Sequence, residues 1–174
     1  MKTFNGSALF LDRSDINTDE IIPAKYLSEI SKEAFKPHLL EDLRLSGFHP
    51  LKDIEGKGVI ISRSNFGCGS SREHAVWALE VNGINIVIAE SYARIFKRNM
   101  FNCGMMAVEL SKSRIDHIHK TFSGPGTILQ TDFENSRFIF RNHEVNATFE
   151  FHISEFDRAL VMAGGWLEYA DKTY

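Results

Sequence analysis

The stretch GVIISRSNFGCGSSREHAVWALEVNGINIVIAE, residues 58–90, contains the pattern that decides the fold. It begins with a run rich in β-branched residues, GVIISRSNF, which predicts a buried strand. The middle part places Ala75, Ala78 and Leu79 at helical spacing and ends at Gly83, where Asn-Gly is a stop signal. The last part, INIVIAE, predicts a second buried strand. Strand, helix and strand at this spacing predict a right-handed βαβ unit in a parallel sheet.

The same alternation continues toward the C-terminus. Residues 91–104 predict another helix, and MMAVEL, residues 105–110, predicts another strand. Beyond them we expect a polar helix, SKSRIDHIHKTF, and then three strands joined by short turns. A final helix begins at Ser154, which has Asp157 three residues later, and stops at Gly164-Gly165. We therefore expect a single α/β domain over residues 1–174, with a parallel βαβ core and an antiparallel β section.

The first third of the chain is less regular. TFNGSALFL, residues 3–11, predicts the first strand, and residues 12–27 predict a loop around a short extended piece. Residues 28–57 are polar and are punctuated by proline and glycine. We expect short helical turns there, without a packed core element. This segment is a candidate flap or a candidate protruding segment that faces a partner.

Composition limits the class of protein. The 174 residues are 43% hydrophobic and 25% charged, as in an ordinary soluble globular domain, and the formal net charge is -3 with a pI of about 6.2. Such a balance argues against nucleic acid or an anionic membrane as a partner. No window has the length and hydrophobicity of a signal peptide or a bilayer span. We therefore expect a cytoplasmic protein.

The potential metal ligands are few and scattered. Cys68 and Cys103 are the only cysteines, so the chain has neither a disulfide framework nor a CxxC pair. A cubane iron–sulfur cluster usually needs three or four thiolates, more than this chain offers. His117 and His119 are two residues apart and point to different faces of a helix. We expect no metal site here; if the function involves metal, another chain supplies it.

The turn SNFGCGSSREHA, residues 64–75, permits two kinds of binding site. The first is a dinucleotide site, because Gly67-x-Gly69 follows a strand and Glu90 ends the next one. Arg72, however, occupies the position of the third glycine, so this fingerprint is incomplete. The second is a site for a small anion and a proton transfer. Glycines allow close approach of a ligand, Arg72 can hold a carboxylate through two hydrogen bonds, and a serine at a helix N-terminus loses its proton more easily.

Each of these residues also has a purely structural interpretation. Ser70 or Ser71 could be a helix N-cap, Glu73 a first-turn acid and His74 a surface residue. We prefer that interpretation for Glu73 and His74. For Ser70 and Arg72 it leaves the two preceding glycines unexplained.

The turn and its surroundings resemble a known family. NFGCGSSREHAVWAL, residues 65–79, resembles the signature of the small swivelling domain of the aconitase superfamily, and INIVIAESYARIF, residues 84–96, resembles the strand and helix that follow it. NTDEIIPAKYL, residues 17–27, and MAGGWLEY, residues 162–169, resemble the early loop and the tail of the separate small subunits of 3-isopropylmalate dehydratases. The resemblance covers nearly the whole chain in the right order.

The resemblance implies a swivelling three-layer β/β/α domain. It also implies a partner, a large subunit that carries a [4Fe–4S] cluster, while this chain binds no cofactor itself. Together the two chains would act as a hydro-lyase in leucine biosynthesis. They would isomerise 2-isopropylmalate and 3-isopropylmalate, small dicarboxylic hydroxy acids, by dehydration and rehydration.

The resemblance also assigns roles to particular residues. Ser70 matches the catalytic base that removes a proton from carbon, and Arg72 matches the arginine that holds a substrate carboxylate. Ser71 matches a position that donates its backbone N–H to substrate, next to Gly69 in the substrate-binding turn. Asp19 matches an active-site acid that orients partner groups; an Asx-turn is a local alternative for it.

Substrate choice would depend on Tyr26, Leu27 and Ser28, which match a loop that senses the variable end of the substrate. Family members that act on an extra carboxylate tend to place arginine there, whereas this chain has Ser28 followed by Glu29. This favours an apolar isopropyl group. Alternatives are a small subunit for 2,3-dimethylmalate or a homoaconitate-type substrate, and a non-catalytic interaction subunit. The roles of Lys25 and Cys68 stay open.

Overall fold

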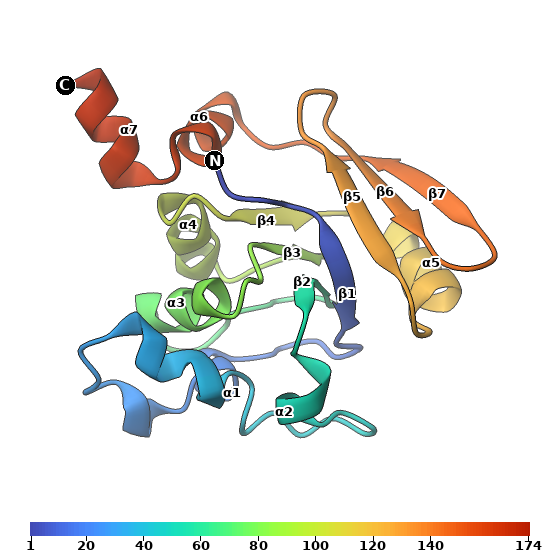
Figure 1. The fold of residues 1–174 in the computed structure, drawn as a ribbon, viewed down its shortest axis with the longest axis horizontal. Coiled ribbons are helices and arrows are strands. Elements are labelled where there is room, and N and C mark those ends of the chain that lie inside the picture. Colours follow the sequence, from blue (N-terminus) through green and yellow to red (C-terminus); the bar gives the residue numbers. More distant parts are fainter.

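The computed structural model describes all of residues 1–174 and contains one seven-stranded mixed sheet (Figure 1). The strand order is β4-β3-β2-β1-β5-β6-β7. The strands are β1 (Gly6–Phe10), β2 (Lys57–Ile61), β3 (Ile86–Ala89), β4 (Met106–Glu109), β5 (Ile128–Asp132), β6 (Arg137–Arg141) and β7 (Asn146–Glu150).

Seven α-helices and two 3₁₀ helices accompany the sheet. They are α1 (Thr18–Ile21), α2 (Pro50–Asp53), α3 (Glu73–Val81), α4 (Arg94–Asn102), α5 (Lys112–Phe122), α6 (Glu155–Ala163), α7 (Trp166–Thr173), η1 (Ala24–Tyr26) and η2 (Lys32–His38). The predicted helices at α3, α4, α5 and α6 are confirmed. The Ser154 side chain accepts a hydrogen bond from the N–H of Asp157, so the predicted N-cap is also confirmed.

The parallel half of the sheet consists of β4, β3, β2 and β1. Ala8 pairs with Val59 and Phe10 with Ile61, while Ile60 pairs with Val87 on the other side of β2. Figure 1 shows α3 and α4 on one side of these strands. The predicted βαβ arrangement is confirmed, and the carboxyl ends of β1 and β2 lie at one edge of the sheet.

The antiparallel half, β5 to β7, continues the same sheet from the other side of β1. Only Gly6 and Ser7 of β1 pair with β5, through Leu129 and Ile128. Figure 1 shows these three strands turned away from the parallel half, with α5 beside them. The predicted fold class is confirmed, and its two β parts are one curled sheet. One cluster of buried hydrophobic residues joins the two halves.

Two expectations about the first third of the chain need correction. Residues 12–27 contain α1 and η1 where we expected a loop around an extended piece, because a capping box starts a helix at Asn17. Residues 28–57 do form short helical turns, η2 and α2, but they are not free of core residues. Five of their apolar side chains are buried in the main cluster: Phe35, Leu39, Leu40, Leu43 and Ile54.

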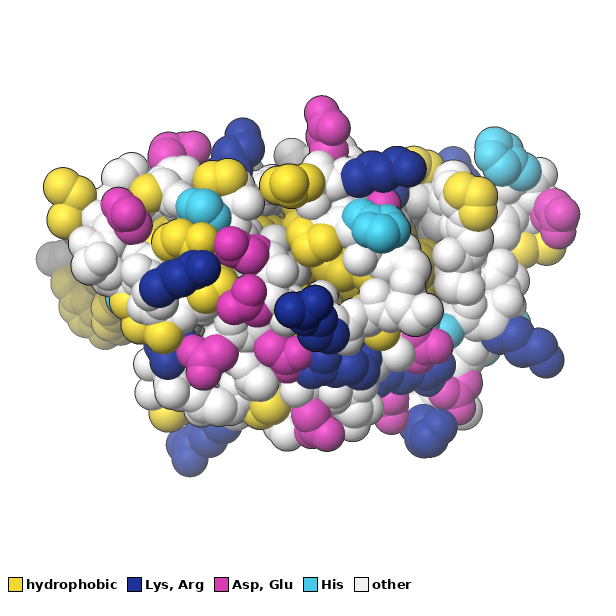
Figure 2. Space-filling view, turned by 90° about the horizontal axis from the view of Figure 1, so that it is seen from below, with side chains coloured by type: hydrophobic (Ala, Val, Ile, Leu, Met, Phe, Trp, Pro, Cys, Tyr) yellow, Lys and Arg dark blue, Asp and Glu magenta, His cyan; other side chains and the backbone are white.

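On the face that Figure 2 shows, Lys and Arg side chains lie among Asp and Glu side chains. This face therefore has no large patch of a single charge. None of the helices combines the length and the apolar character that a membrane span requires.

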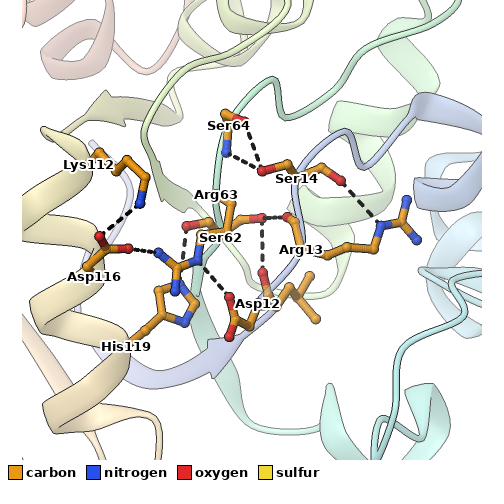
Figure 3. A network of polar contacts seen from close by, with 10 residues as sticks. Asp12, Arg13, Ser14, Ser62, Arg63, Ser64, Lys112, Asp116 and His119 are labelled. Carbon is orange, nitrogen blue, oxygen red and sulfur yellow. Dashed lines mark hydrogen bonds and ion pairs between the residues drawn. The ribbon is translucent and has the colours of Figure 1, made fainter.

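Helix α5 is tied to the ends of β1 and β2 by a polar network (Figure 3). The guanidinium of Arg63 forms ion pairs with Asp12 and with Asp116 of α5. His119, also on α5, is only 5% exposed, and its Nε2 lies 3.2 Å from the carbonyl oxygen of Ser62. Burial lowers the pKa of His119 below its usual value of 6.5, and the nearby charge of Arg63 acts in the same direction.

We predict that His119 makes the protein less stable at mildly acidic pH. The folded protein holds the imidazole neutral, whereas the unfolded chain takes up a proton once the pH falls below about 6.5. The unfolded state then binds more protons, so the free energy of unfolding falls between pH 7 and pH 5. Urea titrations over this range should show a weaker pH dependence for His119→Gln than for the parent. A change as large in the control His117→Gln, at an exposed position of α5, would contradict this assignment.

Candidate active site

The signature loop, residues 65–72, connects β2 to α3 at the carboxyl edge of the parallel strands. Gly67 has a φ of +79°, and a Cβ built there would lie 2.2 Å from Cγ of Phe96 on α4. Gly69 has a φ of +93°. These left-handed conformations and the aromatic ring against Gly67 explain why glycine occupies both positions.

The residues that lead into α1 hold this loop from one side. The backbone N–H of Gly67 donates to the carbonyl of Ile16 over 2.8 Å, and the N–H of Thr18 donates to the carbonyl of Cys68 over 2.8 Å. Between these bonds, Asn17 and Cys68 form an isolated parallel bridge. The segment after β1 and the segment after β2 are therefore joined at the sheet edge.

Three of the predicted site residues meet at this junction. Nη1 of Arg72 forms an ion pair with Oδ1 of Asp19, and Nη2 of Arg72 lies 3.5 Å from Oγ of Ser70. The Arg72 side chain is 17% exposed and the Asp19 side chain 60% exposed. The arrangement places a guanidinium beside a serine hydroxyl on an accessible edge. It can bind an anion and stabilise negative charge on the serine oxygen.

The structure also bears on the structural interpretations of these residues. The N-cap of α3 is Arg72, which makes no side-chain capping bond, so neither Ser70 nor Ser71 caps the helix. Glu73 lies in the first turn of α3, as that interpretation expects. The ring of His74 packs 4.9 Å from Trp77, centroid to centroid, and also meets Phe35 edge-on.

Asp19 is not the residue that starts α1. The side chain of Asn17 accepts the N–H of Glu20, and Glu20 accepts the N–H of Asn17, which completes a capping box without Asp19. This leaves the Asp19 carboxylate to pair with Arg72 across the junction.

Ser71 and Gly69 line a cavity of about 890 Å³ that extends along the first turns of α4. Its walls include Gly67, Arg94 and Asp157. No backbone hydrogen bond uses the N–H of Ser71. Ser71 and Gly69 thus adjoin a space large enough for a small ligand, next to the group formed by Ser70, Arg72 and Asp19.

Tyr26, Leu27 and Ser28 lie at the end of η1 and just after it, and Tyr26 makes contacts of its own. The ring of Tyr26 stacks on His38 at 3.7 Å between centroids, and its hydroxyl donates to Glu41 over 2.9 Å. The ammonium of Lys25 lies 5.2 Å from the same ring. No hydrogen bond or ion pair connects this segment with Ser70, Arg72 or Asp19. The role of these three residues in substrate choice stays a prediction.

The two cysteines are poorly suited to hold metal. Burial raises the pKa of Cys103 to about 12 and also raises the pKa of Cys68, which disfavours the thiolates that bind iron. No three His, Cys, Asp or Glu side chains are grouped as a metal site requires. The residues of this chain do not fit a [4Fe–4S] cluster by themselves.

The start of α1 is fixed by a pair of residues that the sequence pattern did not indicate. Arg13 binds the carboxylate of Glu20 with both terminal nitrogens, and this contact lowers the pKa of Glu20. The spacing of Asn17 and Glu20 is that of a capping box, so the helix start could have been found. The ion pair between Arg13 and Glu20, by contrast, corresponds to no recognisable sequence pattern.

Two comparisons identify the family. A sequence profile of the aconitase C-terminal domain matches residues 1–113. This chain belongs to that family. The crystal structure of 3-isopropylmalate dehydratase from Methanocaldococcus jannaschii is similar over 97% of this chain and 93% of that chain, with a TM-score of 0.79 and 32% sequence identity. The resemblance to the small-subunit type of the aconitase superfamily is confirmed, and the matched residues of this aconitase C-terminal domain include the whole signature loop.

We predict that the signature loop does not tolerate a side chain at Gly67. Gly67→Ala adds a clash with Phe96 to the strain of a left-handed alanine. Gly83→Ala is the matched control, because Gly83 has a φ of +76° and no atom within 4 Å of its Cβ position. We expect the control to lose about 1–2 kcal/mol of unfolding free energy and Gly67→Ala to lose about 1–3 kcal/mol more. Urea denaturation measures both losses. Equal losses would show that the Phe96 ring moves aside without lowering the unfolding free energy, which would contradict the predicted clash.

Proposed function

We propose that this chain is the small subunit of a two-chain hydro-lyase that isomerises 2-isopropylmalate and 3-isopropylmalate, a step of leucine biosynthesis. The observation that carries the proposal is the meeting of Ser70, Arg72 and Asp19 at one accessible edge of the sheet. Membership of the aconitase C-terminal domain family and the similarity to a 3-isopropylmalate dehydratase support it.

In this proposal Ser70 is the base of the dehydration step. As the alkoxide, its Oγ takes the proton from a substrate carbon, and the electron pair of that C–H bond forms the C=C bond. The hydroxyl on the neighbouring carbon leaves with its electron pair as hydroxide, for which the partner subunit would provide the acceptor. Rehydration runs the same steps in reverse, with the hydroxyl added to the other carbon. The guanidinium 3.5 Å from Oγ supports this role, because positive charge lowers the cost of a serine alkoxide.

Arg72 also binds one substrate carboxylate, and Asp19 keeps its guanidinium turned toward the junction. Arginine suits this role because its planar group can donate two parallel hydrogen bonds to one carboxylate. Ser71 and Gly69 contribute backbone at the mouth of the adjoining cavity, and the free N–H of Ser71 is a donor for the same ligand.

The remainder of the site belongs to a partner in this proposal. The family resemblance assigns a [4Fe–4S] cluster to a large subunit, and the two cysteines of this chain do not fit that group. Residues 28–57 are a candidate face for this partner, and the exposed Ser28 and Glu29 lie at the start of that segment. A chain that only docks to a partner would need neither Ser70 nor Arg72, which argues against a non-catalytic subunit.

We predict that the chain alone is inactive and gains activity with a large subunit that carries the cluster. In the reconstituted enzyme, Ser70→Ala should lower kcat by about 10²–10⁴-fold, the usual effect of losing a positioned base. Ser113→Ala, at an exposed position of α5, is the control. Turnover of 3-isopropylmalate under reducing, anaerobic conditions measures both. Near-normal kcat in Ser70→Ala, or turnover by the chain alone, would refute the proposal.

We also predict a preference for a substrate with an apolar variable end. Ser28 offers no guanidinium, and Glu29 repels a third carboxylate, so 3-isopropylmalate should compete better than homoisocitrate. 2,3-Dimethylmalate belongs in the same assay, since it is also apolar at that end. Ser28→Arg should shift the preference toward the tricarboxylate. A parent enzyme that prefers homoisocitrate would contradict the assigned substrate; an unshifted Ser28→Arg enzyme would remove this loop from the specificity site.

A further inference from the structure

Thr18 contacts the signature loop twice and has no assigned role so far. It is 1% exposed at the first position of α1. Its N–H donates to the carbonyl of Cys68 over 2.8 Å, and its hydroxyl donates to the carbonyl of Ser70 over 2.8 Å. One buried residue thus holds the loop on both sides of Gly69, through its backbone N–H before the glycine and through its side-chain hydroxyl after it.

The bond from Thr18 is the only one that holds the backbone of Ser70. Neither the N–H nor the carbonyl of Ser70 takes part in a backbone–backbone hydrogen bond. On one side of Ser70 is Gly69, with a left-handed φ of +93°, and on the other side α3 begins only at Glu73. Without the hydroxyl of Thr18, the Ser70 peptide has no partner that fixes its orientation.

Thr18 itself is held firmly. The capping box of Asn17 and Glu20 fixes the start of α1, and Arg13 clamps Glu20 through two hydrogen bonds. The Thr18 carbonyl accepts the N–H of Ile22 at the end of the helix. The position of the Thr18 hydroxyl is therefore well defined, and its hydrogen bond holds the Ser70 carbonyl of the signature loop in place.

We infer that Thr18 is a positioning residue for Ser70: its hydroxyl sets the direction in which the Ser70 side chain presents Oγ to the substrate. The inference rests on the proposed role of Ser70 as base. Proton transfer needs the two heavy atoms within hydrogen-bond reach, and a misplacement of about 1 Å can cost about 10²-fold in rate. Thr18 touches neither substrate nor reacting atoms, so its effect passes through Ser70.

The test compares two buried threonines in the complex with the cluster-bearing partner. Thr18→Val keeps the shape and removes the hydroxyl; we expect kcat for 3-isopropylmalate to fall about 10–100-fold with KM unchanged. Thr18→Ser keeps the hydroxyl and should restore most of the lost rate. Thr18→Ala replaces the valine variant if the latter does not fold.

Thr127→Val is the matched control. Thr127 is 2% exposed, and its hydroxyl also donates to a backbone carbonyl, that of Phe122. Its loss should lower Tm by about 2–4 °C, the effect of one buried hydrogen bond, and leave kcat unchanged. The effect on kcat thus separates a positioning role of Thr18 from loss of stability alone.

A double-mutant cycle separates this inference from the proposed function. In a Ser70→Ala background, Thr18→Val should lower kcat no further, because the group that it positions is absent. If Thr18→Val has a normal kcat while Ser70→Ala is inactive, the inference about Thr18 is wrong but the proposed function stands. An additive loss in the double variant would also overturn the inference about Thr18. An active Ser70→Ala enzyme would overturn the proposed function, and this inference with it.

Discussion

The parallel pairing of β1 with β2 determines where the chain can place its functional groups. Parallel strands end at the same edge, so the segment after Phe10 and the segment after Ile61 must leave the sheet side by side. One segment then supplies Asp19 and the other supplies Ser70 and Arg72. Residues 50 or more positions apart in sequence become neighbours because of four paired residues in each strand.

Three arginines at the edge that results each have a carboxylate partner. Arg13 pairs with Glu20, Arg63 with Asp12 and Asp116, and Arg72 with Asp19. The first two pairs fix α1 and α5 against the strands. Arg72 differs because one of its nitrogens is also turned toward Ser70. In the proposed function, a substrate carboxylate on Arg72 would share the guanidinium with Asp19.

The sequence was sufficient for the parts of the fold that rest on local pattern. The β-branched runs at β2 and β3 predicted buried strands, and Ser154 with Asp157 predicted the start of α6. Glycines beside Ser70 and Arg72 marked a candidate site, and the structure shows that Asp19 lies against Arg72 there. The helix α7 was missed because Gly164-Gly165 reads as a final stop, although another helix starts at Trp166.

The contacts between distant segments could not be predicted in this way. Nothing local pairs Arg13 with Glu20 across the loop before α1, or seats Phe96 against Gly67. The bond from Thr18 to the Ser70 carbonyl joins residues 52 positions apart. Likewise, Phe35 and Leu40 lie in a polar segment, and only the three-dimensional structure shows that both belong to the main core cluster. These features depend on tertiary packing.

The short pairing of β1 with β5 divides the sheet into two parts, and the strands within each part are paired over more residues than the two parts are with each other. Four residue pairs hold β1 to β2, but only two hold it to β5, whereas five pairs join β5 to β6. Local unfolding proceeds in contiguous cooperative units, so we expect β5, β6 and β7 to loosen together. Ser70 lies beyond β2, outside this unit. Such loosening would leave intact the pairing of β1 with β2 that brings Asp19 and Arg72 together.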